Sequence, residues 1–278
     1  MYIHIGFGRT ATTWLQELIF SQHDKIHYLG KTENNYPQWL IELHYLDDYY
    51  FQKNEKKIKD KINELKDPAK INVISSEAFT RSGGEIFNQA RRIKIIFSNV
   101  KIILVLRDPI DLIASFYKYT VGEGLFTLDL EEYLDWGLTP FVHYKRKPIY
   151  LPDFFYDNTI NIYQSFLGAD TICILKYEDL KNNRDHFFSR LGDFMNVEFD
   201  PEYIKNKTEI HLNTSLPEEQ ITLTRSKNLL CFMEKYFPAI VSKISLDEAA
   251  IGMHSGIITP ELGERLKEYF KGKCYGYY

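Results

Sequence analysis

The sequence predicts an α/β fold in which helices flank a parallel β-sheet. Short apolar runs of strand length alternate with amphipathic segments of helix length, which is typical of parallel sheets. The runs at 2–7 and 101–106 are nearly continuous in apolar residues, as expected for strands that are buried on both faces. Hydrophobic residues make up 44% of the 278 residues, which is enough for a sizeable core. We expect a single domain over 1–278 with a helical C-terminal subregion.

The expected strands share short runs that are rich in apolar, β-branched or aromatic residues. In chain order they lie near 2–7, 26–29, 71–75, 101–106 and 171–176. The first is followed by glycines that allow the chain to turn, and the fourth is unbroken in apolar residues from Ile102 to Leu106. The carboxyl ends of parallel strands meet at one edge of the sheet, where ligands of such folds bind.

The segments between and after these runs carry apolar residues at helical spacing. Helices are expected near 11–21, 37–46, 53–66, 85–97, 109–121, 129–136, 157–167, 184–195, 217–236 and 260–271. The first of them places Leu15, Leu18 and Ile19 on one apolar face. Asp108-Pro109 indicates the start of another, because Asp caps a helix and Pro suits its first position.

The turn after the first strand has the composition of an anion-binding loop. It consists of Gly8, Arg9, Thr10, Ala11, Thr12 and Thr13. Glycine allows close approach of a ligand, the hydroxyls can donate hydrogen bonds, and a guanidinium can grip a phosphate or sulfonate with two of its N–H groups. The nucleotide P-loop pattern is incomplete, because Ala11 and Thr12 stand where it needs Gly-Lys. A dinucleotide loop and a simple tight turn remain as alternatives.

A second cationic side chain follows the fourth expected strand. Arg107 comes directly after that strand, and Ser115 lies eight residues later in the expected helix. If both strand ends lie at the same edge, Arg9 and Arg107 would bind a ligand that is anionic at both ends. The alternative is that Arg107 forms a salt bridge with Asp108 or Asp111 and that Ser115 only packs.

Together these segments resemble the sulfotransferases that use 3′-phosphoadenosine-5′-phosphosulfate (PAPS). Members of that family carry a loop of the form Pro-Lys-[Ser/Thr]-Gly-Thr-Thr after the first strand, and an Arg and a Ser eight residues apart. A third match is Tyr177-Glu178-Asp179-Leu180, which resembles the family's Tyr-Glu-Asp-Leu. The matches occur in the family's order between residue 2 and about residue 200. The resemblance implies a three-layer sulfotransferase fold like that of the P-loop NTPases, PAPS as donor and its desulfated form, PAP, as product.

The resemblance also implies roles for individual residues. The loop from Gly8 to Thr13 would bind the 5′-phosphosulfate, and Arg107 and Ser115 would bind the 3′-phosphate. Trp14 would stack on the adenine and Tyr177 would contact its edge, although either ring is equally well explained as a core aromatic.

Two positions of the loop depart from the family pattern. Arg9 replaces the usual Lys, which keeps the charge but removes a mobile proton donor. Ala11 replaces the usual Gly, so that a positive φ at this position would be costly.

Two carboxylates compete for the role of catalytic base. Glu33 lies just beyond the second expected strand, at a distance from the loop similar to that of the catalytic Glu in heparan-type and tyrosyl-protein sulfotransferases. Glu77 lies at the end of the third expected strand, near the place of the catalytic His in cytosolic sulfotransferases. We favour Glu33, and we expect that Lys31 assists the leaving group. The alternatives are an exposed loop charge for Glu33 and a helix cap or an Arg81 partner for Glu77.

The charge and the cysteines of the sequence indicate which partners, metals and cellular location to expect. The net charge of −4 carries no nucleic-acid signal. A local basic run at 143–147 could contact an acidic acceptor, although a solvated basic loop explains it better. The three cysteines are scattered, and no His, Cys or Asp cluster has zinc-like spacing, so neither a disulfide framework nor a metal is expected. No membrane span or signal peptide is expected, which together with the cysteines favours the cytoplasm.

The function that the resemblance implies is transfer of a sulfuryl group from PAPS to a hydroxyl or amine. The acceptor would be a glycan, a lipid or another small molecule, and neither its identity nor the oligomeric state follows from the sequence. Two alternatives remain: a P-loop-like kinase, and a non-catalytic nucleotide- or glycan-binding protein that retains the fold.

Overall fold

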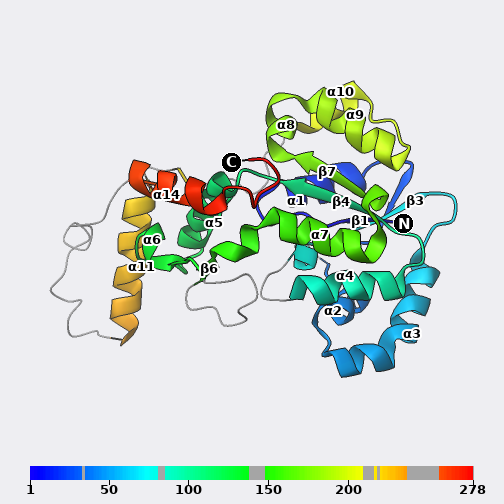
Figure 1. Cartoon of the computed structure of the whole chain (residues 1–278), viewed down its shortest axis with the longest axis horizontal. Helices are drawn as coiled ribbons and strands as arrows, with labels where there is room; N and C mark the ends of the chain where they lie inside the picture. The colour runs from blue at the N-terminus through cyan, green and yellow to red at the C-terminus, as the bar shows by residue number, and fades with distance from the viewer. Residues whose placement is uncertain are drawn as a thin grey trace. The chain divides into compact units, whose positions relative to one another are not determined.

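The computed structural model describes residues 1–32, 35–80, 85–137, 148–208, 216–217, 220–236 and 257–277. The chain divides into two compact units (Figure 1). Unit 1 comprises Met1–Arg107 and Tyr156–Asn213, and unit 2 comprises Asp108–Phe155 and Thr214–Tyr278. The single domain expected over 1–278 stays a prediction, and each unit is described by itself.

Unit 1 contains a five-stranded sheet in which every neighbouring pair is parallel. The strands are β1 (Tyr2–His4), β2 (Ile26–Tyr28), β3 (Ile71–Ser75), β4 (Lys101–Leu106) and β7 (Ile172–Lys176), in the order β2-β3-β1-β4-β7. His4 at the end of β1 is in register with Ser75 on one side and with Ile103 on the other. The sheet confirms the predicted α/β class and brings the carboxyl ends of β1, β3 and β4 side by side.

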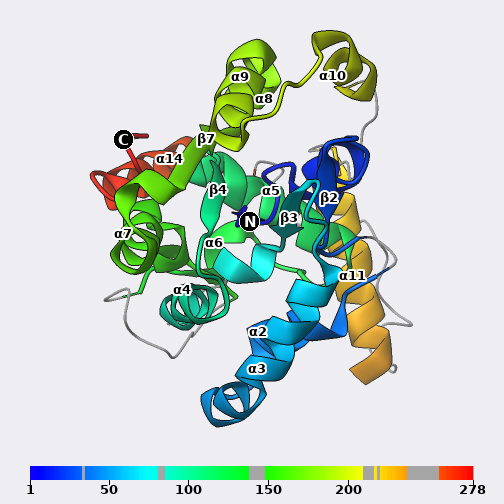
Figure 2. The same ribbon diagram turned by 90° about the vertical axis from the view of Figure 1, so that its right-hand side faces the viewer.

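Helices of unit 1 cover both faces of this sheet. They are α1 (Thr12–Trp14), the π-helix η1 (Leu15–Phe20), α2 (Gln38–Tyr45), α3 (Asp48–Leu65), the 3₁₀ helix η2 (Glu77–Thr80), α4 (Glu85–Ile96), α7 (Tyr156–Leu167), the 3₁₀ helix η4 (Ala169–Thr171), α8 (Tyr177–Asn182), α9 (Arg184–Met195) and α10 (Pro201–Thr208). In Figures 1 and 2, α8, α9 and α10 lie on one side of the sheet and α4 lies on the other. The arrangement is the layered one expected when a parallel sheet must bury both faces.

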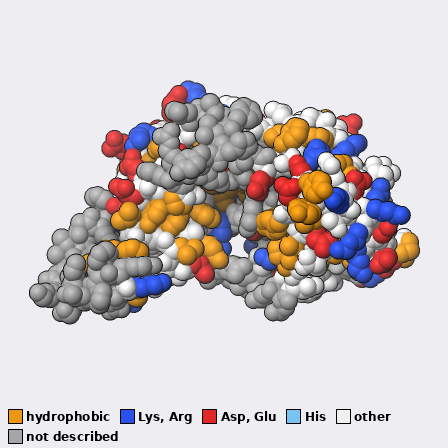
Figure 3. Space-filling view, turned by 90° about the horizontal axis from the view of Figure 1, so that it is seen from below, with side chains coloured by type: hydrophobic (Ala, Val, Ile, Leu, Met, Phe, Trp, Pro, Cys, Tyr) orange, Lys and Arg blue, Asp and Glu red, His pale blue; other side chains and the backbone are white. Residues whose placement is uncertain are grey.

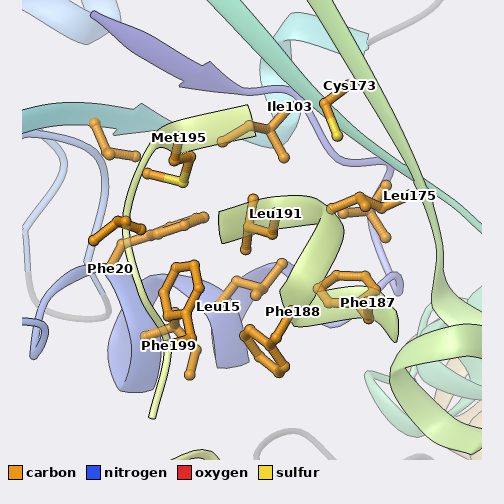
Figure 4. Close-up of a cluster of buried hydrophobic side chains, with 14 of the residues drawn as sticks. Leu15, Phe20, Ile103, Cys173, Leu175, Phe187, Phe188, Leu191, Met195 and Phe199 are labelled. Carbon is orange, nitrogen blue, oxygen red and sulfur yellow. The ribbon is translucent and has the colours of Figure 1, made fainter. Parts of the chain in front are cut away.

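The main hydrophobic cluster joins η1 and α9 to the strands (Figure 4). Leu15, Phe187 and Leu191 are fully buried in it, together with Ile103 of β4. Burying side chains of this size stabilises the fold by roughly 1.5–3 kcal/mol each. The helix that follows the turn after β1 is therefore fixed to the sheet by its buried face.

Unit 2 is largely helical. It contains α5 (Pro109–Gly122), α6 (Leu130–Tyr133), the short strands β5 (Leu134–Asp135) and β6 (Ile149–Tyr150), the 3₁₀ helix η3 (Leu151–Phe154), α11 (Ile221–Tyr236) and α14 (Pro260–Phe270). The α5 helix packs against α11 and α14. It begins as predicted, because the Asp108 carboxylate accepts hydrogen bonds from the backbone N–H groups of Ile110 and Asp111. No helix within the described ranges is both long and apolar enough to cross a bilayer.

The helices α8 and α10 were not expected from the sequence, and three expected helices differ from the observed ones. The helix expected over 129–136 ends at Tyr133, because Leu134 and Asp135 pair with β6 instead. The helix expected over 53–66 begins at Asp48, where the Asp47 side chain accepts a hydrogen bond from the backbone N–H of Tyr49. The helix expected over 11–21 begins as a short α-helix and continues as a π-helix.

Exposed charges of the described residues include close pairs of opposite sign. On the face in Figure 3, basic and acidic side chains of the described residues are interspersed. Two lysines of α3 show the pattern locally, since Lys57 pairs with Glu42 and Lys61 pairs with Glu64. Exposed pairs of this kind are worth only about 0–1 kcal/mol.

The chain at the end of β2 passes unusually close to the end of β3. A Cβ on Gly30 would lie 2.5 Å from the backbone nitrogen of Ser75 and 2.5 Å from the Tyr28 hydroxyl. The hydroxyl of Tyr28 donates a 2.5 Å hydrogen bond to the carbonyl of Lys31. Only glycine permits this approach, which brings Lys31 to the same edge as Ser76 and Glu77.

Gly30→Ala is expected to destabilise the protein by about 1–3 kcal/mol, because the backbone must shift to admit the methyl group. The measurement is the free energy of unfolding in denaturant. Gly263→Ala is the control, since a Cβ there meets only ordinary contacts inside α14, where Ala exceeds Gly in helix propensity. Equal effects of the two changes would contradict the close approach.

Candidate active site

The turn between β1 and α1 is held together by its own hydroxyl groups. Thr10 Oγ1 donates a 2.6 Å hydrogen bond to the carbonyl of Phe7, and Thr12 Oγ1 donates a longer one of 3.3 Å to the same oxygen. Both threonines are buried, at 0% and 2% exposure. On the other side, Thr80 Oγ1 donates a hydrogen bond to the carbonyl of Gly6. The hydroxyls of Thr10 and Thr12 therefore stabilise the turn itself through hydrogen bonds to its backbone.

Two residues of the turn adopt left-handed backbone conformations although neither is glycine. Arg9 has φ 69°, and Ala11 has φ 62° and ψ 23°. The positive φ foreseen as costly at Ala11 is adopted, and such a conformation costs roughly 1–2 kcal/mol for a residue with a Cβ. Strain of this kind persists only where the surroundings enforce it.

The strained turn opens directly into the helical segment. Ala11 is the N-cap of α1, no side chain caps the helix, and the Ala11 carbonyl accepts the first helical bond from Leu15. The first N–H groups of a helix have no partner within the helix, and they favour an anion. The assignment of this turn to the 5′-phosphosulfate stays a prediction.

Arg107 links the end of β4 to this turn. Its Nη1 donates a 3.0 Å hydrogen bond to the carbonyl of Arg9. Its guanidinium carbon lies 4.7 Å from the centre of the Tyr177 ring. Its Nε is buried and has no hydrogen-bond partner among the described residues. An unpaired donor of a cationic group fits the phosphate that the sequence assigns to Arg107. The structure brings Arg9, Arg107 and Tyr177 together.

Ser115 belongs to unit 2, where it lies on α5 and is 8% exposed. Its predicted contact with the 3′-phosphate stays a prediction.

Trp14 and Tyr177 both pack against the main hydrophobic cluster. Trp14 Nε1 donates a 3.3 Å hydrogen bond to the carbonyl of Lys207, and its ring centre lies 6.2 Å from that of Phe188. Both aromatic residues are half-buried, so each has one side in the core and one side at the surface. The core contacts are shown, and the predicted adenine contacts stay a prediction.

Glu77 lies against the turn. Its Oε2 is 3.6 Å from the point where a Cβ on Gly8 would sit, and the residue is exposed. Lys31 is also exposed, with its Nζ 5.8 Å from the centre of the Tyr36 ring. Glu33 lies outside the described residues, as does the basic run at 143–147. Of the two candidate bases, Glu77 is therefore the one with a described position.

A buried polar group lies beneath the turn, and sequence reasoning missed two of its members, Ser75 and Gln16. His4 Nδ1 and Ser75 Oγ are 2.7 Å apart, and Gln16 Nε2 donates a 2.9 Å hydrogen bond to the same Ser75 oxygen. Complete burial lowers the pKa of His4 to about 3, so the imidazole is neutral. The group ties β1, β3 and η1 together directly below Gly6, whose Cβ would lie 3.0 Å from His4 Nε2. His4, a polar residue inside the apolar run 2–7, is the feature of the sequence that indicates this buried group.

A cavity of about 550 Å³ lies elsewhere, along α9. Its apolar wall includes Phe188, Val197 and Phe199, and Asp185 and Asp193 also line it. None of the predicted site residues is among its lining residues. The described residues contain no group of three His, Cys, Asp or Glu side chains placed to hold a metal ion.

Comparison with known proteins identifies the relatives of this chain. The family model of the sulfotransferase domain matches residues 2–275. Among solved structures, the chain is similar to a sulfotransferase from Alicyclobacillus acidocaldarius, with TM-score 0.52 and 16% identity over 89% of this chain and 97% of that one. It is similar to the sulfotransferase domain of the curacin biosynthetic pathway, with TM-score 0.52 and 16% identity over 96% of each chain.

A third structure is the mouse sulfotransferase SULT7A1 in complex with PAP, with TM-score 0.50 and 11% identity over 100% of this chain and 84% of that one. No curated protein matches the chain in sequence. At these identities the solved structures support the fold, and the family model supports the family.

Ala11→Gly is expected to leave the free energy of unfolding equal to that of the wild type, or to raise it by up to about 1 kcal/mol. Relief of the left-handed conformation offsets the extra freedom of glycine in the unfolded chain. Ala114→Gly, inside α5, is the control and should lose about 1 kcal/mol. Denaturant unfolding of the three proteins makes the comparison. A loss at Ala11 as large as that at Ala114 would contradict the left-handed conformation.

Proposed function

The chain belongs to the sulfotransferase family, and from this premise we propose that it transfers a sulfuryl group from PAPS to a hydroxyl or amine. The observation that carries the proposal is the hydrogen bond from Arg107 to the Arg9 carbonyl. It joins the two cationic strand ends that the sequence assigns to opposite ends of the donor. A nucleotide with a 5′-phosphosulfate and a 3′-phosphate has one anionic group for Arg9 and one for Arg107.

The donor would be held by residues whose contacts fit its two ends. The N–H groups at the start of α1 and the Arg9 side chain would hold the 5′-phosphosulfate, and the unpaired Nε of Arg107 would donate to the 3′-phosphate. Trp14 would stack on the adenine, Tyr177 would contact its edge, and Ser115 would add a hydroxyl to the 3′-phosphate. Each of these roles is proposed on the family resemblance together with the contacts described above.

The bound donor supplies a sulfuryl group that is activated by its bond to the 5′-phosphate. The acceptor oxygen or nitrogen forms a bond to sulfur, the bond from sulfur to the 5′-phosphate oxygen breaks, and a carboxylate takes the acceptor proton. Arg9 and the N–H groups of the turn stabilise the negative charge that gathers on the leaving phosphate, as in phosphoryl transfer. Lys31 is proposed to assist at the same oxygen.

The base is proposed to be Glu33 or Glu77. The position of Glu77 beside Gly8 supports it, because a base must lie within reach of the acceptor at the transferring group. Glu33 is supported by its distance from the loop in the sequence, which matches that of related enzymes. The two are separated by experiment below.

The acceptor class follows from the proposed chemistry rather than from a described pocket. A glycan, a lipid or another small molecule with a nucleophilic hydroxyl or amine is proposed, and the cytoplasm is proposed as the location. Transfer of labelled sulfate to a panel of glycans, lipids, phenols and peptides identifies the acceptor.

Donor specificity is tested by thermal unfolding with nucleotides. PAP is expected to raise the midpoint by on the order of 5 °C at about 100 times its Kd, and ATP with magnesium is expected to leave it unchanged. Stabilisation by ATP instead would indicate a kinase. Stabilisation by PAP without transfer to any acceptor in the panel would indicate a binding protein that retains the fold.

The base is tested by two isosteric changes. The true base, changed from Glu to Gln, should lose about 10²–10⁴-fold in kcat while the affinity for PAP stays the same. Glu33→Gln and Glu77→Gln are compared by kcat and by calorimetry, with Glu85→Gln at the start of α4 as control. If neither change lowers kcat, the base is neither carboxylate.

A further inference from the structure

Arg107 contacts Arg9, Tyr156 and Tyr177 of unit 1 besides any ligand. We propose that Arg107 is a positioning residue of the turn after β1, so that one guanidinium couples the two ends of the bound donor. The coupling rests on the proposed function, since it assumes the 3′-phosphate contact. The bracing of the turn rests only on contacts within the protein.

The bond to Arg9 determines the direction of a peptide group in the turn. Arg107 Nη1 lies 3.0 Å from the Arg9 carbonyl oxygen. A trans peptide is planar, so a carbonyl turned toward Arg107 points the N–H of Thr10 to the opposite side. Arg9 is also one of the two left-handed residues, with φ 69°. The guanidinium therefore holds the turn at its strained position, where an unsupported backbone would relax.

Two tyrosines hold Arg107 in place, one at its guanidinium and one at its backbone. The Tyr177 ring supports its face, with the guanidinium carbon 4.7 Å from the ring centre. The backbone carbonyl of Arg107 accepts a 2.6 Å hydrogen bond from the Tyr156 hydroxyl. The Tyr156 ring is fully buried and lies 4.9 Å from the ring of Phe7 in the turn. Arg107 is thus a rigid support rather than a mobile surface cation.

The guanidinium has donors left for a phosphate. Arginine carries five N–H donors in a fixed fork, and Nη1 gives one of them to Arg9. The Nε–H is buried and has no partner among the described residues. A phosphate can bind this side of the fork while Nη1 keeps the Arg9 carbonyl. Lysine would not hold both partners in one fixed geometry, because its ammonium is a point charge on a flexible stem.

The first experiment uses the protein without ligand. Hydrogen exchange is measured by mass spectrometry on peptides that cover 7–14, in wild type, Arg107→Gln and Arg107→Lys. If Arg107 braces the turn, exchange there should be at least about tenfold faster in both variants, while peptides that cover β4 keep their wild-type rates.

Lys101→Gln is the matched control. Lys101 is a cation at the opposite end of β4 that also lies over aromatic rings, with Nζ 5.1 Å from the centre of the Phe194 ring. It should leave exchange in the turn unchanged. Unchanged exchange in both Arg107 variants would overturn the bracing, whatever the result with nucleotides.

The second experiment separates bracing from phosphate contact. Calorimetry measures the affinity of wild type and Arg107→Lys for PAP and for adenosine 5′-monophosphate, which lacks the 3′-phosphate. If Arg107 only contacts the 3′-phosphate, the variant and the wild type bind the monophosphate equally, and the coupling is overturned. If Arg107 also positions the turn, the variant binds both nucleotides more weakly, by about tenfold for PAP and several-fold for the monophosphate.

The two experiments distinguish a failure of this inference from a failure of the proposed function. A wild-type protein that binds neither nucleotide contradicts the proposed donor and with it the coupling, while the exchange rates still decide the bracing. Thermal unfolding of each variant shows that it is folded. If Arg107→Gln does not fold, Arg107→Lys alone decides the bracing.

Discussion

The described part of the site depends on the shape of one turn, between β1 and α1, which the chain builds without glycine at its left-handed positions. Arg9 and Ala11 both carry a Cβ and both have positive φ. Each would relax in an isolated peptide. Three sets of hydrogen bonds hold the turn in this conformation. They come from hydroxyls within the turn, from Thr80 of η2, and from Arg107, which follows β4. An anion-binding geometry is thus maintained by tertiary contacts rather than by backbone freedom.

The helical segment that follows the turn of the site also contributes buried side chains to the hydrophobic core. The η1 helix buries Leu15 and Phe20 in the cluster that also contains Phe187 and Leu191 of α9. Protein cores are packed as densely as organic crystals. The start of the helical segment therefore cannot move without disturbing the packing of these side chains. Beneath the turn, hydrogen bonds pair His4 Nδ1, Ser75 Oγ and Gln16 Nε2, while the buried His4 Nε2 has no partner among the described residues.

The candidate site residues divide according to how far the sequence could place them. The position of Arg107 after an apolar strand predicts a phosphate ligand, and the structure shows a contact with the Arg9 carbonyl that no local pattern indicates. Glu77 was the less favoured base, yet it lies beside Gly8. Ser75 and Gln16 were not predicted, because an isolated Ser or Gln in a sequence has many possible roles.

The sequence by itself determined the five strands of the unit 1 sheet in chain order, the start of α5 at Asp108, and the two cationic residues that follow β1 and β4. These features are local: they follow from apolar spacing, from capping residues and from a few adjacent positions. Only the tertiary structure decided the left-handed conformations in the turn, the departure of Leu134 into β5 and the bond from Arg107 to the Arg9 carbonyl. Each of these depends on a partner distant in the sequence, and the free energy of such long-range contacts overrides the local preference of the chain.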